Sequence, residues 1–299
     1  MIIVGVDAGG TKSKAVAYDC EGNFIGEGLS GPGNYHNVGL TKAIEHIKEA
    51  ISLAVKQKEP NVVAIGAAGL DSRFDWENFY PLASLIAPKV VIQHDGVIAL
   101  FAETLGKPGV VVISGTGSVV EGFDGNQFIR LGGRGWLLSD EGSSYWIGRK
   151  ALRKVLKMMD GIEKKTLLYD KVLKRINVRD LDELVLWAYE SSCKIDLIAS
   201  VAVAVDEAAK EGDENALEIL RSGAEALANQ AVILANKIGA NIVYLKGGMF
   251  KSQIYRDFFI SYLDEHGLKG ELGKREPEFG AVVLGYKEAG CDIKKLIRD

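Results

Sequence analysis

The chain has 299 residues, 47% of them hydrophobic, so it can bury one large core or two medium ones, and we expect two domains. Its formal net charge of −4 at pH 7 argues against nucleic acid as the main partner, because phosphate backbones are bound by basic surfaces.

The first predicted element is a hairpin. The apolar run Ile2–Val6 is typical of a buried strand, Asp7-Ala-Gly-Gly-Thr11 predicts a tight turn, and Ala15–Tyr18 resumes strand character. Glycines in such a turn let backbone N–H groups approach a ligand, and a row of these groups forms an anion cradle. Asp7 could hold a hydrated Mg²⁺, because hard cations prefer oxygen ligands. An ordinary Gly-rich hairpin is the alternative. Gly5–Ser13 is a poor P-loop, since its order is Gly-Thr-Lys-Ser and no helix follows.

Helices and strands then alternate along the first half. We predict a sharp loop, a helix capped by Thr41, a strand, a helix, a strand and a helix, at residues 30–33, 41–55, 62–65, 75–86, 89–93 and 96–105. His94-Asp95-Gly96 follows the strand Lys89–Gln93, at the carboxyl end where open α/β sheets bind ligands.

The opening pattern occurs a second time. Val110–Ser118 is again an apolar run leading into a turn of small residues, and Val119-Val120 resumes the strand. Asp124-Gly-Asn126 then turns the chain, as Glu21-Gly-Asn23 does in the first copy. This repetition indicates an internal duplication. Two such halves that face each other would clamp a polyphosphate between their turns.

The remainder of the second half is mostly helical. Helices are expected at about 145–160, through most of 181–237, at 254–266, and from about 278 onward. A strand at Asn241–Leu245 leads into Lys246–Met249.

The cysteines and the hydropathy of the chain indicate in which compartment it resides. Cys20, Cys193 and Cys291 are odd in number and far apart, so we expect free buried thiols and no disulfide framework or zinc site. The longest apolar stretch, Leu197–Val205, is too short for a bilayer, which takes ~20 residues. No basic leader or cleavage site precedes the first strand. We expect a cytoplasmic protein with no membrane partner.

Four motifs together resemble those of a known family. Asp7-Ala-Gly-Gly-Thr11, Gly115-Thr-Gly-Ser118, Asp140-Glu-Gly-Ser143 and Gly247-Gly-Met249 look like the two phosphate motifs, the sugar motif and the adenosine motif of actin-like sugar kinases. In particular, the chain resembles the N-acetylglucosamine kinase and BadF/BadG-type ATPase family over its whole length. Within that family its motifs look most like those of the broad-specificity, ATP-dependent hexokinases of archaea.

The resemblance implies a fold and an activity. The fold would be α/β, a two-domain actin-like ATPase (ribonuclease H-like) with duplicated βββαβαβα halves and an interdomain cleft. The domains would be 1–107 and 108–280, with a C-terminal helix at 281–299 packed back on the first. The activity would be transfer of the γ-phosphoryl group of Mg·ATP to the 6-hydroxyl of hexoses or amino-hexoses such as glucose, mannose, glucosamine and N-acetylglucosamine. A homodimer is also implied.

A second class of function stays open. BadF/BadG-type ATPases activate a partner enzyme and hold an iron–sulfur cluster with paired cysteines, whereas Cys193 and Cys291 have no obvious partner in the sequence. In either class an acidic protein can bind the nucleotide with backbone N–H groups, helix N-termini and Mg²⁺.

Three polar residues have both a functional and a structural interpretation. Asp95 could accept the proton of a sugar hydroxyl, or it could cap the following helix; the family's catalytic Asp occupies this place. Asn34 could bind sugar hydroxyls or form an Asx-turn. Asp140 could bind sugar, as in the family, or cap a helix.

The resemblance assigns further residues. The sugar would be bound by Asn34, Asp71, Asp95, Gly117, Ser118, Gly133, Arg134, Gly135, Trp136 and Asp140, and ATP by Gly9, Gly10, Thr11, Lys12, Thr116, Ala199, Gly247 and Gly248, with Asp7 holding Mg²⁺ through water. The family usually has Gly-Trp-Gly in the sugar pocket, but here Arg134 takes the Trp place and Trp136 follows two residues later. Either Trp136 stacks on the sugar from a shifted position or Arg134 contacts its hydroxyls.

Overall fold

The computed structural model describes residues 1–190 and 195–297 of the chain. These residues form two compact units. The first unit contains Met1–Gly109, Glu121–Phe128 and the residues from Gly273 onward, and the second contains Val110–Val120 and Ile129–Leu272.

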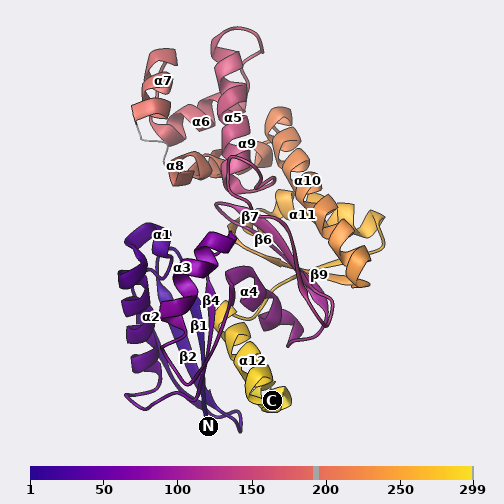
Figure 1. Cartoon of the computed structure of the whole chain (residues 1–299). Coiled ribbons are helices and arrows are strands. Elements are labelled where there is room, and N and C mark those ends of the chain that lie inside the picture. Colours follow the sequence, from indigo (N-terminus) through magenta and orange to yellow (C-terminus); the bar gives the residue numbers. More distant parts are fainter. Residues whose placement is uncertain (191–194, 298–299) are drawn as a thin grey trace. The chain divides into compact units, whose positions relative to one another are not determined.

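The first sheet has the order β3-β2-β1-β4-β5 (Figure 1). Its strands are β1 (Ile2–Ala8), β2 (Ser13–Asp19), β3 (Phe24–Ser30), β4 (Val62–Ala67) and β5 (Lys89–His94). β1 pairs antiparallel with β2 and parallel with β4, which in turn pairs parallel with β5. β1 and β4 lie in the middle and are apolar along nearly their whole length, because both of their faces are covered.

Helices cover the two faces of this sheet. They are α1 (Tyr35–Val38), α2 (Leu40–Ala54), α3 (Arg73–Ala83), α4 (Asp95–Thr104), α12 (Pro277–Ala289) and the 3₁₀ turn η2 (Ile293–Ile297). α2 packs on β2 and β3 through an apolar face that includes Ile47 and Ile51. α12 packs on β1 and α4, and a Cβ atom at Gly280 would overlap the backbone of Ile98. The backbones of α12 and α4 therefore lie in direct contact at this point, with no side chain between them.

The last helix ends earlier than the resemblance implies. α12 stops at Ala289 rather than continuing to residue 299, because Gly290 takes a left-handed conformation (φ +71°) that terminates the helix.

The second sheet repeats the topology of the first. Its order is β10-β9-β6-β7-β8, formed by β6 (Gly109–Ser114), β7 (Ser118–Phe123), β8 (Phe128–Gly132), β9 (Ile242–Lys246) and β10 (Lys269–Leu272). In both sheets a three-strand meander is followed by parallel strands on the other side of its first strand. The predicted internal duplication is confirmed. β10 was not predicted, because Lys-Gly-Glu-Leu shows neither an apolar run nor alternation.

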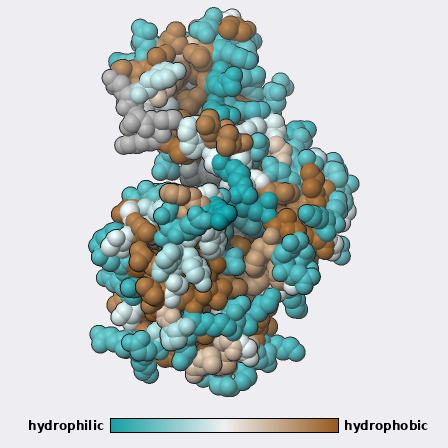
Figure 2. Space-filling view, in the orientation of Figure 1, coloured by the Kyte–Doolittle hydropathy of each residue, from teal (hydrophilic) through white to brown (hydrophobic). Residues whose placement is uncertain are grey.

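Helices make up most of the second unit. They are α5 (Ser144–Met159), α6 (Leu167–Ile176), α7 (Leu181–Glu190), α8 (Ile195–Ser200), α9 (Ala202–Lys210), α10 (Glu214–Ile238), α11 (Gln253–Glu265) and the 3₁₀ turn η1 (Gly248–Lys251). Apolar side chains reach the surface of the second unit (Figure 2). Leu156 on α5 and Leu186 on α7 are among the exposed ones. Within the described part of the chain, no helix combines the length and the apolar character that crossing a membrane requires.

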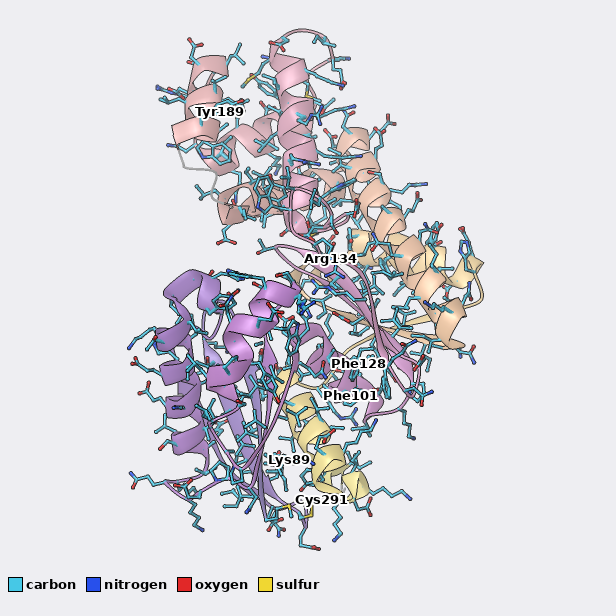
Figure 3. The ribbon with its side chains drawn as sticks, viewed as in Figure 1. Lys89, Phe101, Phe128, Arg134, Tyr189 and Cys291 are labelled. Carbon is cyan, nitrogen blue, oxygen red and sulfur yellow. A yellow bond between two sulfur atoms is a disulfide. The ribbon has the colours of Figure 1, made fainter. Side chains whose placement is uncertain are left out.

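A disulfide joins two segments at opposite ends of the chain. Cys20 and Cys291 are bonded, with a Cα–Cα distance of 5.5 Å and a sequence separation of 271 (Figure 3). The expectation of free thiols is wrong for these two residues, because the end of β2 and the end of α12 share one apolar cluster that includes Tyr286. Such a pairing leaves no signature in the sequence. Cys193 lies outside the described residues.

We predict that this disulfide stabilises the first unit. Replacing Cys291 by Ser should lower the free energy of unfolding by about 2–5 kcal/mol, because the unfolded chain regains the freedom that a long closed loop had removed. Denaturant unfolding of the wild type and the variant, each with and without reductant, measures this. Reductant should destabilise the wild type and leave Cys291→Ser unchanged. Equal stability of all four samples would contradict the prediction.

Candidate active site

Carboxylates gather at one edge of the first sheet. Because β1, β4 and β5 are parallel, their carboxyl ends lie at the same edge. Asp7 stands one residue before the end of β1, Asp71 follows β4, and Asp95 directly follows β5. The structure thus brings these three predicted residues to one edge.

The first hairpin tip is fixed by the loop that carries Asn34. The Gly9 N–H donates to the Lys12 carbonyl at 3.0 Å, which closes the turn. The backbone N–H groups of Gly33 and Asn34 donate to the Gly9 carbonyl at 2.9 and 3.1 Å. Thr11 and Lys12 remain exposed. The tip is therefore ordered by its backbone while its side chains face solvent.

Asn34 has a local structural role. Its Oδ1 accepts the His36 backbone N–H at 3.0 Å and caps α1, which is the turn-forming interpretation. A sugar-binding role is compatible with this contact and stays a prediction.

Asp75 ties together the loops that carry Asn34 and Asp71, a role that the sequence did not reveal. Its carboxylate accepts from the Tyr35 hydroxyl and from the Asp71 backbone N–H, the latter at 3.1 Å. It also lies 3.0 Å from His36 Nε2. Burial alone would raise the pKa of Asp75, but hydrogen bonds from Ser72 and Tyr35 hold it below its ordinary value. The ionised carboxylate therefore anchors both loops.

Asp7 lies in acidic surroundings. Burial, together with the carboxylates of Asp95 and Glu278, raises the pKa of Asp7 to about 7. Among the described residues, no group of three or more His, Cys, Asp or Glu side chains could enclose a metal. This donor set fits Mg²⁺, which keeps several waters and needs only one or two carboxylates besides the substrate phosphates.

Asp95 does not cap the helix that it begins. His94 is the N-cap of α4, and Asp95 occupies the first helical position. The Asp95 side chain is 38% exposed, and its Oδ1 lies 3.0 Å from His94 Nδ1. The capping interpretation of Asp95 is wrong, and its carboxylate is left available at the sheet edge. The sequence had placed His94 at this strand end without assigning it a role.

The second hairpin tip rests against the start of α5. The Gly115 N–H donates to the Gly117 carbonyl at 2.9 Å, and the Ser144 N–H donates to the Gly115 carbonyl at 2.8 Å. Ser143 caps α5, so the partial positive charge of this helix terminus lies beside the tip. An anion at the tip would be stabilised by that terminus.

Asp140 is held beneath the same tip. It is buried and adopts a left-handed backbone conformation (φ +65°). A Cβ atom at Gly117 would lie 2.8 Å from Asp140 Oδ2, so only glycine lets the tip approach this carboxylate. Ser118 Oγ donates to the Glu141 carbonyl at 2.7 Å. Because Ser143 is the helix cap, the capping interpretation of Asp140 is wrong.

The loop that departs from the family pattern separates its two large side chains. Gly132, Gly133 and Gly135 all have positive φ values. Arg134 is exposed (Figure 3), whereas Trp136 is half-buried, with its ring centroid 5.5 Å from that of Tyr145 on α5. Trp136 is thus packed against the helix, and Arg134 faces solvent.

A pocket of about 750 Å³ lies in the second unit. It is lined by Gly115, Thr116, Ser144, Asp196, Ala199, Ser200, Ala202, Val203, Asp206, Lys210, Gly248, Met249, Lys251 and Ser252. Three of the residues predicted to bind ATP, namely Thr116, Ala199 and Gly248, therefore line one pocket. Gly247 adjoins it with φ +103°, and a Cβ atom there would overlap the Ser114 backbone.

The predicted site residues fall into two groups. The first unit holds Asp7, Gly9, Gly10, Thr11, Lys12, Asn34, Asp71 and Asp95, and the second holds Thr116, Gly117, Ser118, Gly133, Arg134, Gly135, Trp136, Asp140, Ala199, Gly247 and Gly248. Charged groups dominate the first, and glycines and hydroxyls the second.

Known proteins resemble this chain over most of its length. The model of the BadF/BadG/BcrA/BcrD ATPase family matches residues 4–285. An N-acetyl-D-glucosamine kinase of Dictyostelium discoideum is 31% identical, over 95% of this chain and 97% of that protein. An N-acetylmuramic acid/N-acetylglucosamine kinase of Clostridium acetobutylicum is 28% identical, over 97% and 99%.

A solved structure shares the fold. A candidate N-acetylglucosamine kinase from Chromobacterium violaceum has a TM-score of 0.80 with 23% identity, and the match covers 95% of this chain and 98% of that one. The predicted fold class, an α/β two-domain actin-like architecture with duplicated halves, is confirmed.

Proposed function

Because the chain belongs to the BadF/BadG/BcrA/BcrD ATPase family, we propose that it is an ATP-dependent kinase of amino sugars, with N-acetylglucosamine and glucosamine as substrates. The observation that supports this most directly is the pocket of the second unit, because three predicted nucleotide contacts line it. The curated relatives that match nearly the whole chain carry the names of kinases that act on such sugars.

Nucleotide binding would rely on backbone groups more than on basic side chains. The tip Gly115–Gly117 lies at the N-terminus of α5, and the dipole of this helix would stabilise phosphates there, although the Ser144 and Tyr145 N–H groups are already bonded to carbonyls of the tip. A Cβ atom at Gly248 would have no neighbouring atom within 4 Å, so the backbone there is open to a ligand such as the ribose. The exposed tip around Thr11 would bind phosphates from the first unit.

Asp95 would act as the general base. The 6-hydroxyl of the sugar loses its proton to the Asp95 carboxylate while its oxygen forms a bond to the γ-phosphorus, and the bond between that phosphorus and the ADP oxygen breaks. Mg²⁺ held through water by Asp7 would neutralise phosphate charge during this transfer. Positioning and charge neutralisation supply most of the rate, since the reaction needs little covalent help from the protein.

The activator ATPase is the weaker alternative. Cys20 and Cys291 are bonded to each other, so neither thiolate is free to bind iron. Among the residues that the structure describes, no cluster of metal-binding side chains is present either.

A coupled ADP-release assay across a panel of sugars tests the function. With Mg·ATP, we expect turnover to depend on N-acetylglucosamine or glucosamine, and we also predict acceptance of glucose and mannose, with the 6-phosphate as the product. ADP release at the same rate without any sugar would contradict a sugar kinase and favour the activator ATPase. The predicted homodimer can be checked on the same sample by light scattering.

Replacing Asp95 by Asn should remove the base and keep the shape of the side chain. We expect kcat to fall at least ~100-fold, while sugar affinity stays within about threefold, because general-base help contributes ~10²–10⁴-fold. Steady-state kinetics and calorimetric sugar binding measure the two effects. Asp264→Asn, an exposed position on α11, is the matched control and should change neither. Near-normal turnover of Asp95→Asn would remove Asp95 from its role.

Substitutions at two neighbouring glycines distinguish an effect on nucleotide binding from an effect on stability. Gly248→Ala should raise the KM for ATP about five- to tenfold and leave the melting temperature unchanged, because its Cβ meets only the ligand. Gly247→Ala should lower the melting temperature, because φ +103° and the adjacent Ser114 backbone exclude a side chain. An unchanged KM in Gly248→Ala would place the nucleotide elsewhere.

A further inference from the structure

The imidazole of His94 lies among three carboxylates of the first unit. Its Nδ1 is 3.0 Å from Asp95 Oδ1 and 3.1 Å from Glu121 Oε1, and its Nε2 is 3.5 Å from Asp71 Oδ1. The ring itself is largely buried, with 13% of its side chain exposed. One neutral or cationic ring therefore contacts the proposed base and two further acids.

Glu121 is the most deeply buried carboxylate of this cluster. It belongs to the stretch Glu121–Phe128 of the first unit, and its side chain is 3% exposed. A Cβ atom at position 96 would lie 2.5 Å from Glu121 Cγ, so the glycine at the start of α4 is what lets this carboxylate reach the ring. A carboxylate buried this deeply needs a hydrogen-bond donor or a positive charge beside it.

His94 Nδ1 has two roles to choose between. The Gly96 backbone N–H points at it from 3.2 Å, which makes His94 the N-cap of α4 if Nδ1 carries a lone pair. The carboxylates of Asp95 and Glu121 lie closer and call for an N–H at the same atom. One nitrogen cannot serve both, because an Nδ1 that bears a proton has no lone pair. Hydrogen bonds to ionised acceptors are roughly twice as strong as neutral ones, which favours the carboxylates.

We propose that His94 is the positioning residue for Asp95, with Nδ1–H donating to the Asp95 and Glu121 carboxylates. This inference rests on the proposed kinase function for its kinetic consequence, but its structural claim does not. With the ring in place, the Asp95 carboxylate is held in one orientation and the buried charge of Glu121 is compensated. Without the donor, two nearby carboxylates repel each other, so Asp95 turns away from the acceptor hydroxyl.

Two substitutions distinguish positioning from capping. Asn and Ser both accept from a backbone N–H and are good N-caps, but only the Asn amide also reaches the carboxylates with a donor. We expect His94→Asn to keep kcat within about fivefold of the wild type. We expect His94→Ser to lose at least ~30-fold in kcat, with the KM for sugar and for ATP within about threefold. Melting temperatures should be alike in the two variants. Equal kcat values in the two variants would overturn the proposal.

A second measurement requires no turnover. Nitrogen-15 spectra of the histidine rings, with the His94 signals assigned by their loss in His94→Asn, report which ring nitrogens carry protons at pH 7. A protonated Nδ1 supports the proposal, and an Nδ1 with a lone pair overturns it. If the wild type released no ADP in response to any sugar, the proposed function would fail, whereas these spectra would still decide the role of His94.

Discussion

The parallel pairing of β1, β4 and β5 is the constraint on which the first unit depends, because it delivers acidic residues from distant parts of the sequence to one sheet edge. Like charges gathered in this way repel each other; the pKa of Asp7 is raised mainly by burial and further by the nearby carboxylates of Asp95 and Glu278. The fold offsets the repulsion with local donors. Asp75 receives hydrogen bonds from Tyr35 and Ser72, and the ring of His94 stands between Asp95 and Glu121. An acidic edge of this kind would attract a hydrated divalent cation, and with it the phosphates of a nucleotide.

The chain has a net charge of −4, whereas the nucleotide that we propose for the second unit is a polyanion. In this unit the backbone comes close to its neighbours at two glycines. Because Gly117 has no side chain, the hairpin tip can contact the Asp140 carboxylate. Because Gly247 has none, the loop after β9 can contact the Ser114 backbone. The tip also contacts the start of α5, where the helix dipole favours negative charge. Fixed backbone dipoles of this kind need no rearrangement when a charged ligand arrives, which is the property that stabilises developing charge.

Local patterns carried most of what could be predicted from the sequence. Both hairpins, the repeated meander and the place of Asp95 at a strand end follow from apolar runs and glycine turns, which are short-range signals. Contacts between distant segments were not predictable. The bond between Cys20 and Cys291 joins positions 271 residues apart, and the contact of His94 with Glu121 depends on how α4 meets β7. Competition between equally suitable caps was also unpredictable: Asp95 and Asp140 both looked like helix caps, yet His94 and Ser143 occupy the N-cap positions.

The duplicated halves have the same topology but different chemistry. Between Gly109 and Val120 the second copy has no charged residue, whereas the first copy carries Asp7, Lys12 and Lys14 in the equivalent meander. A hairpin of neutral residues can bind phosphate only through N–H and hydroxyl groups, which suits a part of the ligand that does not react. Proton transfer and cation binding need titratable groups, and these lie on the first copy and the strands beside it. Under the proposed function, one meander topology would therefore serve two tasks, because its backbone geometry is shared while the side chains at its edge differ.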